Sequence, residues 1–244
     1  MAIGPNNQFE LRTGRMTSAR ADAAPVDAGL RKYMLKVYNY MASGVLLTGI
    51  VASAVASSPA ALEMIFGSGL SFVVMLAPFA FILALSFGIN KMSAGTAQAM
   101  FWAFAGVMGV SLSSVFLAYT GESVARVFFI TAGAFAGLSL YGYTTKKNLT
   151  AFGSFLIMGL IGLVIAMVAN IFLQSSAMQF VISVLGVLIF AGLTAYDTQK
   201  IKLIYSVLDD SEVYGKKAIM GALTLYLDFI NMFMMLLHLF GNRE

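Results

Sequence analysis

Two aspartates interrupt the apolar C-terminal part of the chain. Asp197 lies in AGLTAYDTQKIK, and Asp228 lies in ALTLYLDFINMFMMLLHLF. A carboxylate in a membrane-spanning segment costs ~2.5–3.5 kcal/mol on insertion scales, so such a residue marks an ion or proton pathway. Two carboxyls in one site of low dielectric do not both ionise readily, so we expect this pair to share a proton. The pair would then sense pH, bind a cation such as Ca²⁺ in passing, or do both.

Three further side chains could support the pair. Asn231 follows Asp228 by three residues and shares its helix face, so it offers another oxygen. Tyr196 and Tyr226 could donate hydrogen bonds to the carboxyls. Those bonds also allow a second interpretation, in which each aspartate is protonated or hydrogen bonded and only holds helices together.

The sequence gives little support for a metal site or an enzyme active site. The chain has no cysteine and one histidine, His238, so it lacks ligands for a thiolate or histidine-rich metal site. It contains no HExxH, Walker A or GxSxG motif. We therefore expect neither an enzyme nor a bound cofactor. An intramembrane aspartyl protease remains a minor alternative because two aspartates are present.

The composition indicates an all-α integral membrane protein. Of the 244 residues, 59% are hydrophobic and 11% are charged, against about 25% charged in soluble domains. The apolar runs are continuous over ~20 residues, which predicts helices that cross a bilayer. Seven such runs are found: 34–56, 70–87, 97–119, 124–143, 151–173, 178–196 and 218–240.

These runs divide the chain into three parts. Residues 1–33 predict a basic, disordered tail, residues 34–240 a seven-helix domain, and residues 241–244 a short C-terminal tail. Within the domain, Pro78 predicts a kink in the second span. Gly133 and Gly137 form a GxxxG motif in the fourth span, which predicts close helix packing.

The basic residues predict the orientation in the membrane. If the N-terminus is cytoplasmic, then all 15 Lys and Arg residues except Arg126 and Arg243 fall in cytoplasmic segments or at their edges. The positive-inside rule therefore places the N-terminus in the cytoplasm and, after seven spans, the C-terminus outside. The net charge of +4 is thus a topology signal, and we expect no nucleic-acid partner.

The stretches ALTLYLDFINMFMMLLHLFG and AGLTAYDTQKIK together resemble the Bax inhibitor-1 family, also called the transmembrane Bax inhibitor motif family. Within this family the chain resembles bacterial members of the YccA type, which implies a stress-response role in the inner (plasma) membrane. The resemblance implies a seven-helix bundle with the C-terminal helix at its centre. It also implies a pH-sensitive Ca²⁺ leak that Asp197 and Asp228 gate through a shared proton.

One departure from the family concerns the latch of the aspartate pair. Family members can use an arginine near the end of the second span, but Lys91 is the only basic residue near that place here. A lysine cannot form the bidentate contact of a guanidinium, so a Lys91 latch would be weaker. The alternative function is a non-transporting membrane interaction protein. The YccA-type resemblance implies that it would modulate a membrane-bound quality-control protease or other stress-response partners, with the N-terminal tail as a binding segment.

Overall fold

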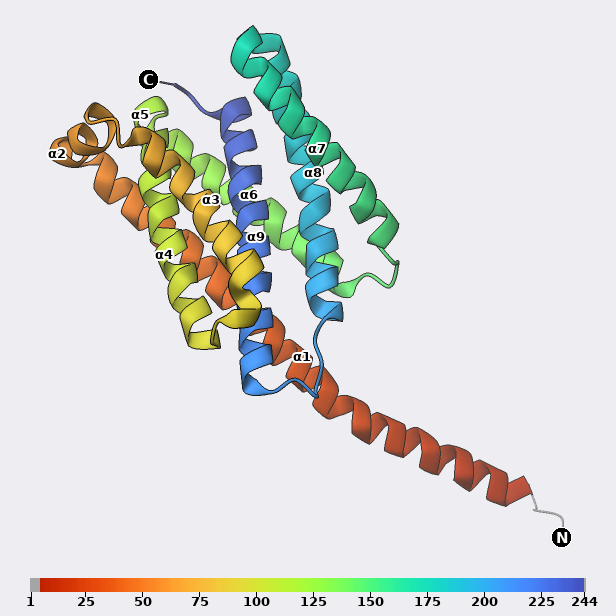
Figure 1. The fold of residues 1–244 in the computed structure, drawn as a ribbon. Coiled ribbons are helices and arrows are strands. Elements are labelled where there is room, and N and C mark those ends of the chain that lie inside the picture. The colour runs from red at the N-terminus through yellow and green to blue at the C-terminus, as the bar shows by residue number, and fades with distance from the viewer. Residues whose placement is uncertain (1–4, 244) are drawn as a thin grey trace.

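The computed structural model describes the backbone of residues 5–243 and the side chains of residues 27–243. The described part is built from helices and short helical turns (Figure 1). In chain order these are α1 (Pro5–Ala56), α2 (Pro59–Leu62), the π-helical turn η1 (Glu63–Gly67), α3 (Ser71–Gly88), the 3₁₀ turn η2 (Ile89–Lys91), α4 (Ala94–Leu112), α5 (Val115–Ala118), α6 (Gly121–Thr144), α7 (Thr150–Leu173), α8 (Ser176–Leu203) and α9 (Ser211–Phe240).

Seven helical segments within residues 27–243 are long and apolar enough to cross a membrane, which confirms the predicted number. Their bounds are Asp27–Ala56, Ser71–Lys91, Ala94–Ala118, Gly121–Thr144, Thr150–Leu173, Ser176–Leu203 and Ser211–Phe240. The sixth segment continues seven residues beyond the predicted end, so Asp197 lies inside α8 instead of following it. The extension is polar but still packed, because Thr198, Gln199 and Ile201 are buried.

The start of the first span differs from the predicted boundary at residue 33. The helix α1 runs without a break from Pro5, and its N-terminal part projects away from the bundle (Figure 1). Tyr33 and Val37 are completely buried, and Leu30 packs against the same core. The apolar packing of α1 therefore begins before residue 33. The prediction of a disordered tail also covers residues 1–4, which lie outside the described residues.

The last helix, α9, is the most extensively covered of the seven spans. In its most apolar stretch 72% of the residues are buried, compared with 11–33% in the other six spans. The helix contacts α1, α4, α6 and α8, and in Figure 1 it runs between the α3–α4 pair and the α7–α8 pair. Lipid replaces these neighbours for the outer helices, whose large apolar side chains remain exposed.

Pro78 lies inside α3, as predicted, and a neighbouring helix satisfies the carbonyl that it leaves free. A proline has no N–H, so the carbonyl four residues earlier, that of Val74, loses its helical donor. The Ser111 hydroxyl of α4 donates to the Val74 oxygen at 2.6 Å. This bond joins α3 to α4 and satisfies a carbonyl that has lost its donor within α3.

The prediction for the GxxxG motif was wrong within this chain. A Cβ added at Gly133 or at Gly137 would meet no atom within 4 Å, so neither glycine serves a close helix contact. The glycine of α6 that does is Gly142, where a Cβ would collide with the backbone oxygen of Ala195 in α8. Spacing alone does not reveal which face of a helix meets its neighbour.

The C-terminal tail is fixed to the end of the bundle opposite the projecting part of α1. The backbone N–H of Asn242 donates to the Ser123 hydroxyl at 2.9 Å, and its carbonyl accepts from the N–H of Thr120 at 3.1 Å. The Arg126 guanidinium donates to the Phe240 carbonyl at 3.2 Å. These bonds hold the C-terminal end of α9 against the start of α6.

Candidate functional site

The two predicted aspartates come together at the interface of α8 and α9. Asp197 lies in α8 with 9% of its surface exposed, and Asp228 lies in α9 with 5% exposed. Their side chains interact directly across the interface. The sequence predicted this meeting from the antiparallel order of the last two spans, and the structure shows it.

The carboxyl of Asp228 has an unusual environment. Its Oδ2 atom is buried, and no N–H or O–H donor from the described residues reaches it. The polar group beside it is the Asp197 carboxyl, which in its ionised form offers no hydrogen either. An isolated buried carboxylate is costly, and two adjacent carboxylates repel each other. The arrangement is therefore suited to holding a proton or a cation between the two groups.

Each residue of the YDTQ sequence contacts a different part of the bundle. The Tyr196 ring fills the space above Gly153 in α7, and Asp197 faces α9. The Thr198 hydroxyl lies 2.9 Å from that of Ser139 in α6. The Gln199 amide accepts from the Leu149 N–H at 2.9 Å and donates to the Lys147 carbonyl at 2.8 Å, which fixes the loop between α6 and α7. These contacts fix the rotation of α8 and thereby the direction of Asp197.

The depth of Asp197 relative to α6 is set by a close backbone approach. Gly142 has no side chain to keep the helices apart, and the backbone of Ala195 occupies the place where a Cβ would stand. Ala195 precedes Asp197 by two residues. A shift of α8 at this contact would therefore move the carboxyl of Asp197 against α9.

The two tyrosines that we expected to support the aspartates make their contacts elsewhere, Tyr226 with α1 and Tyr196 with α7. The hydroxyl of Tyr226 lies 2.7 Å from that of Thr48 in α1. The Thr48 hydroxyl has one hydrogen, which it donates to a backbone carbonyl, either that of Ala105 at 2.8 Å or that of Gly44 at 3.0 Å. In the bond between the two hydroxyls, Tyr226 is therefore the donor and Thr48 the acceptor. Its hydrogen is thus committed to α1 and does not reach Asp228. Tyr196 packs on Gly153.

Among the hydrogen bonds and ion pairs of the described residues, none joins Asn231 or Lys91 to the two aspartates. The Asn231 amide nitrogen donates to the carbonyl of Leu227 at 2.8 Å. Lys91 is exposed at the end of η2, and the one ion pair in the described residues joins Lys217 to Asp209. Lys200 lies closer in sequence, three residues after Asp197 on α8. The Lys91 latch stays a prediction.

The ligand set does not suit a tightly bound metal ion. Within the described residues, no group of three or more His, Cys, Asp or Glu side chains could hold one. Calcium takes six to eight oxygen ligands, and the aspartate pair supplies at most four carboxylate oxygens. A calcium ion at the pair would therefore have to keep some of its water ligands.

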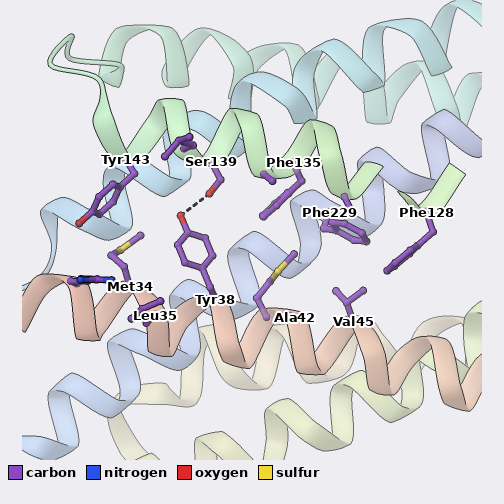
Figure 2. Close-up of a pocket in the computed structure, with 15 residues that line it drawn as sticks. Met34, Leu35, Tyr38, Ala42, Val45, Phe128, Phe135, Ser139, Tyr143 and Phe229 are labelled. Atoms are coloured by element: carbon purple, nitrogen blue, oxygen red, sulfur yellow. Dashed lines mark hydrogen bonds between the residues drawn. The ribbon is translucent and has the colours of Figure 1, made fainter. Parts of the chain in front are cut away.

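The sequence alone did not reveal a chain of hydroxyl groups beside the pair. The Tyr38 hydroxyl of α1 lies 2.7 Å from the Ser139 hydroxyl of α6, as Figure 2 shows, and Ser139 in turn contacts Thr198. Three helices are thus linked at the residue that follows Asp197. The available signal was the run of polar residues after Tyr196 in an otherwise apolar helix.

Comparisons with known proteins agree over nearly the whole chain. The family model described as "Inhibitor of apoptosis-promoting Bax1" matches residues 30–244. A Caulobacter vibrioides protein is 50% identical over 255 residues, covering 98% of this chain and all of the relative. The Rickettsia prowazekii protein RP147 is 49% identical over 218 residues (89% and 92% coverage). Inner membrane protein YbhL of Escherichia coli is 46% identical over 220 residues (89% and 94%).

Proposed function

The chain belongs to the Bax inhibitor-1 family, and from that premise we propose that it is a passive, pH-gated Ca²⁺ leak of the inner membrane. The gate is the pair Asp197 and Asp228. The leak is passive because the sequence holds no nucleotide-hydrolysis motif. The assignment to the inner membrane is supported by the seven apolar helices and by the similarity to inner membrane protein YbhL of Escherichia coli.

One observation carries the proposal. Asp228 Oδ2 is buried with no donor among the residues that the structure describes, and the carboxyl of Asp197 lies beside it. If both groups were charged, two unit charges about 4 Å apart would repel by about 4 kcal/mol at an effective dielectric of ~20. A single proton converts this repulsion into a charge-assisted hydrogen bond. The contact between the two side chains therefore supports a proton-holding, closed state.

The direction of gating follows from this contact. While one proton is shared, α8 and α9 are held together at the pair and the path stays closed. When rising pH removes the proton, the two carboxylates repel each other and attract a cation instead. The repulsion is a sizeable part of a typical stability of about 5–15 kcal/mol, so it can move a helix without unfolding the bundle. Ca²⁺ flux should therefore increase with pH.

The position of α9 supports its role as the element that responds. It contacts four other spans and is the most buried of the seven, which supports the central place expected for it. The same helix also packs against α1 and α4. Movement of Asp228 away from α8 would therefore be transmitted to the side of the bundle formed by α1 and α4.

The proposal is tested by reconstituting the purified protein into liposomes that contain a fluorescent Ca²⁺ indicator. The rate of Ca²⁺ entry is measured over a pH series and compared with protein-free liposomes of the same composition. We expect entry above the protein-free rate, with a rate that rises with pH. Entry no faster than in protein-free liposomes at every pH, from protein shown to be folded by circular dichroism, would rule out the leak.

A further inference from the structure

A lateral groove runs between α1 and α6 on the membrane-facing side of the bundle. Its walls are the two helices, and its floor includes Phe229 of α9, as Figure 2 shows. The Phe229 ring packs edge-on against Phe128 and Phe135 of α6, at 5.6 Å between centroids in both cases. The bond from Tyr38 to Ser139 joins the two walls.

The groove has the size and chemistry of a ligand site. Its volume is about 600 Å³, within the ~300–1,000 Å³ of small-molecule pockets. Apart from Arg31 and the hydroxyls of Tyr38, Ser139 and Tyr143, its lining side chains are apolar. A second cavity of about 550 Å³ shares Val45, Phe128 and Phe229 with it and continues toward the other end of the bundle.

The end of the groove nearest the N-terminus is positively charged. Arg31 lines it and is exposed. Lys202 lies beside the same end, because its ammonium group donates to the carbonyl of Tyr143 at 2.8 Å and sits 5.1 Å from the centre of that ring. No acidic side chain from residues 27–243 lines the groove. This end thus favours a negatively charged group.

The distance between the charged end and the floor matches one leaflet of a bilayer. Arg31 and Val45 are fourteen residues apart on α1, which is ~21 Å at ~1.5 Å per residue. Half of a hydrocarbon core is ~15 Å thick, and the headgroup region adds several ångströms. An occupant with its charge at Arg31 would therefore place its apolar part along the groove and end near Phe229.

We propose that this groove binds an anionic phospholipid. One acyl chain lies between α1 and α6, and the phosphate lies at Arg31 and Lys202. Lipid is the medium that faces this side of the protein, and the basic end beside an apolar groove is complementary to a lipid with a negatively charged headgroup. The assignment is independent of the leak, because it involves neither aspartate.

The experiment measures lipid retained by the purified full-length protein. The protein is loaded in detergent with equimolar phosphatidylglycerol and phosphatidylcholine, and native mass spectrometry counts the adducts. Two variants test the site, each with a matched control. Arg31→Gln removes the charge at the end of the groove, and its control is Lys32→Gln at the exposed neighbouring position. Ala136→Phe fills the groove, and its control is Ala134→Phe, at an exposed position that does not line the groove.

We expect the wild type to retain one phosphatidylglycerol in preference to phosphatidylcholine. Arg31→Gln should lower that preference roughly five-fold, the usual effect of one basic residue at a membrane surface, and Lys32→Gln should change it little. Ala136→Phe should abolish the retained adduct, whereas Ala134→Phe should keep it. Three results would each overturn the proposal. They are equal retention of both lipids, equal losses in a variant and its control, and a dimer of the protein that Ala136→Phe abolishes, which would mean that a second copy occupies the groove.

Discussion

Asp197 and Asp228 meet across the α8–α9 interface, and Asp228 Oδ2 is buried with no donor from the described residues. Protein interiors leave few buried polar atoms without a partner, so each such atom in a native structure calls for a physical explanation. A shared proton provides one here, because it turns the second carboxyl into the missing donor. The same arrangement makes the interface depend on pH.

The bond from Tyr226 to Thr48 should stabilise the bundle without setting its pH response. Tyr226→Phe removes one buried hydrogen bond, so we expect a loss of about 0.5–1.5 kcal/mol in the free energy of unfolding. The pH at which Ca²⁺ flux is half-maximal should stay the same. Thermal denaturation in detergent and the liposome assay measure the two effects; a large shift of the flux profile would mean that this tyrosine acts on the aspartates after all.

The close approach at Gly142 should tolerate no side chain. Gly142→Ala places a methyl group against the Ala195 carbonyl, and overpacking of this kind typically costs about 1–3 kcal/mol. Gly137→Ala is the matched control on the same helix, since a Cβ there meets no atom within 4 Å. The melting temperature should fall for Gly142→Ala and stay constant or rise slightly for Gly137→Ala. Equal changes in both would contradict the assigned contact.

Lys200 should set the pH range of the gate. Lys200 follows Asp197 by three residues on α8, a spacing at which side chains are neighbours, and a nearby positive charge favours a carboxylate over the neutral acid. Lys200→Gln removes this effect, so the proton should be held to a higher pH and the flux profile should shift in the alkaline direction. Lys146→Gln, which alters an exposed loop lysine, serves as the control. A shift toward lower pH in Lys200→Gln would show that the sign is wrong.

Deletion of the N-terminal tail should distinguish the leak from the alternative function, in which the protein modulates a membrane-bound protease. Residues 2–26 precede the part of α1 that packs into the bundle. We expect their deletion to leave both the rate and the pH dependence of Ca²⁺ flux intact. Loss of flux from a deleted protein that still folds would instead place the tail in the transport mechanism.

The sequence predicted the spans and the aspartate pair because both depend on composition along one chain. Continuous apolar runs reveal helices, and a carboxylate within such a run is conspicuous by its cost. Contacts between helices were harder to predict. Gly142 was missed and Gly133 was overvalued, because the face of a helix that meets its neighbour depends on the packing of the whole bundle.

The hydrogen-bond partners of the polar side chains also could not be predicted from the sequence. Tyr226 follows the pattern of a residue that supports Asp228, yet its hydroxyl points to Thr48, which is 178 positions away in the chain. Ser139 and Thr198 gave no individual signal, since intramembrane hydroxyls most often bond within their own helix. The groove between α1 and α6 arises from the spacing of two helices that are far apart in sequence, so no local pattern reveals it.

The most direct test of the shared proton is the pH profile of Ca²⁺ flux through Asp228→Asn in liposomes, measured beside the wild type and the exposed-site control Asp27→Asn. An asparagine at position 228 can donate to the Asp197 carboxylate at any pH and does not titrate. The account predicts low, pH-independent flux for Asp228→Asn, with a wild-type profile for Asp27→Asn. Flux through folded Asp228→Asn that still rises with pH as in the wild type would contradict the account.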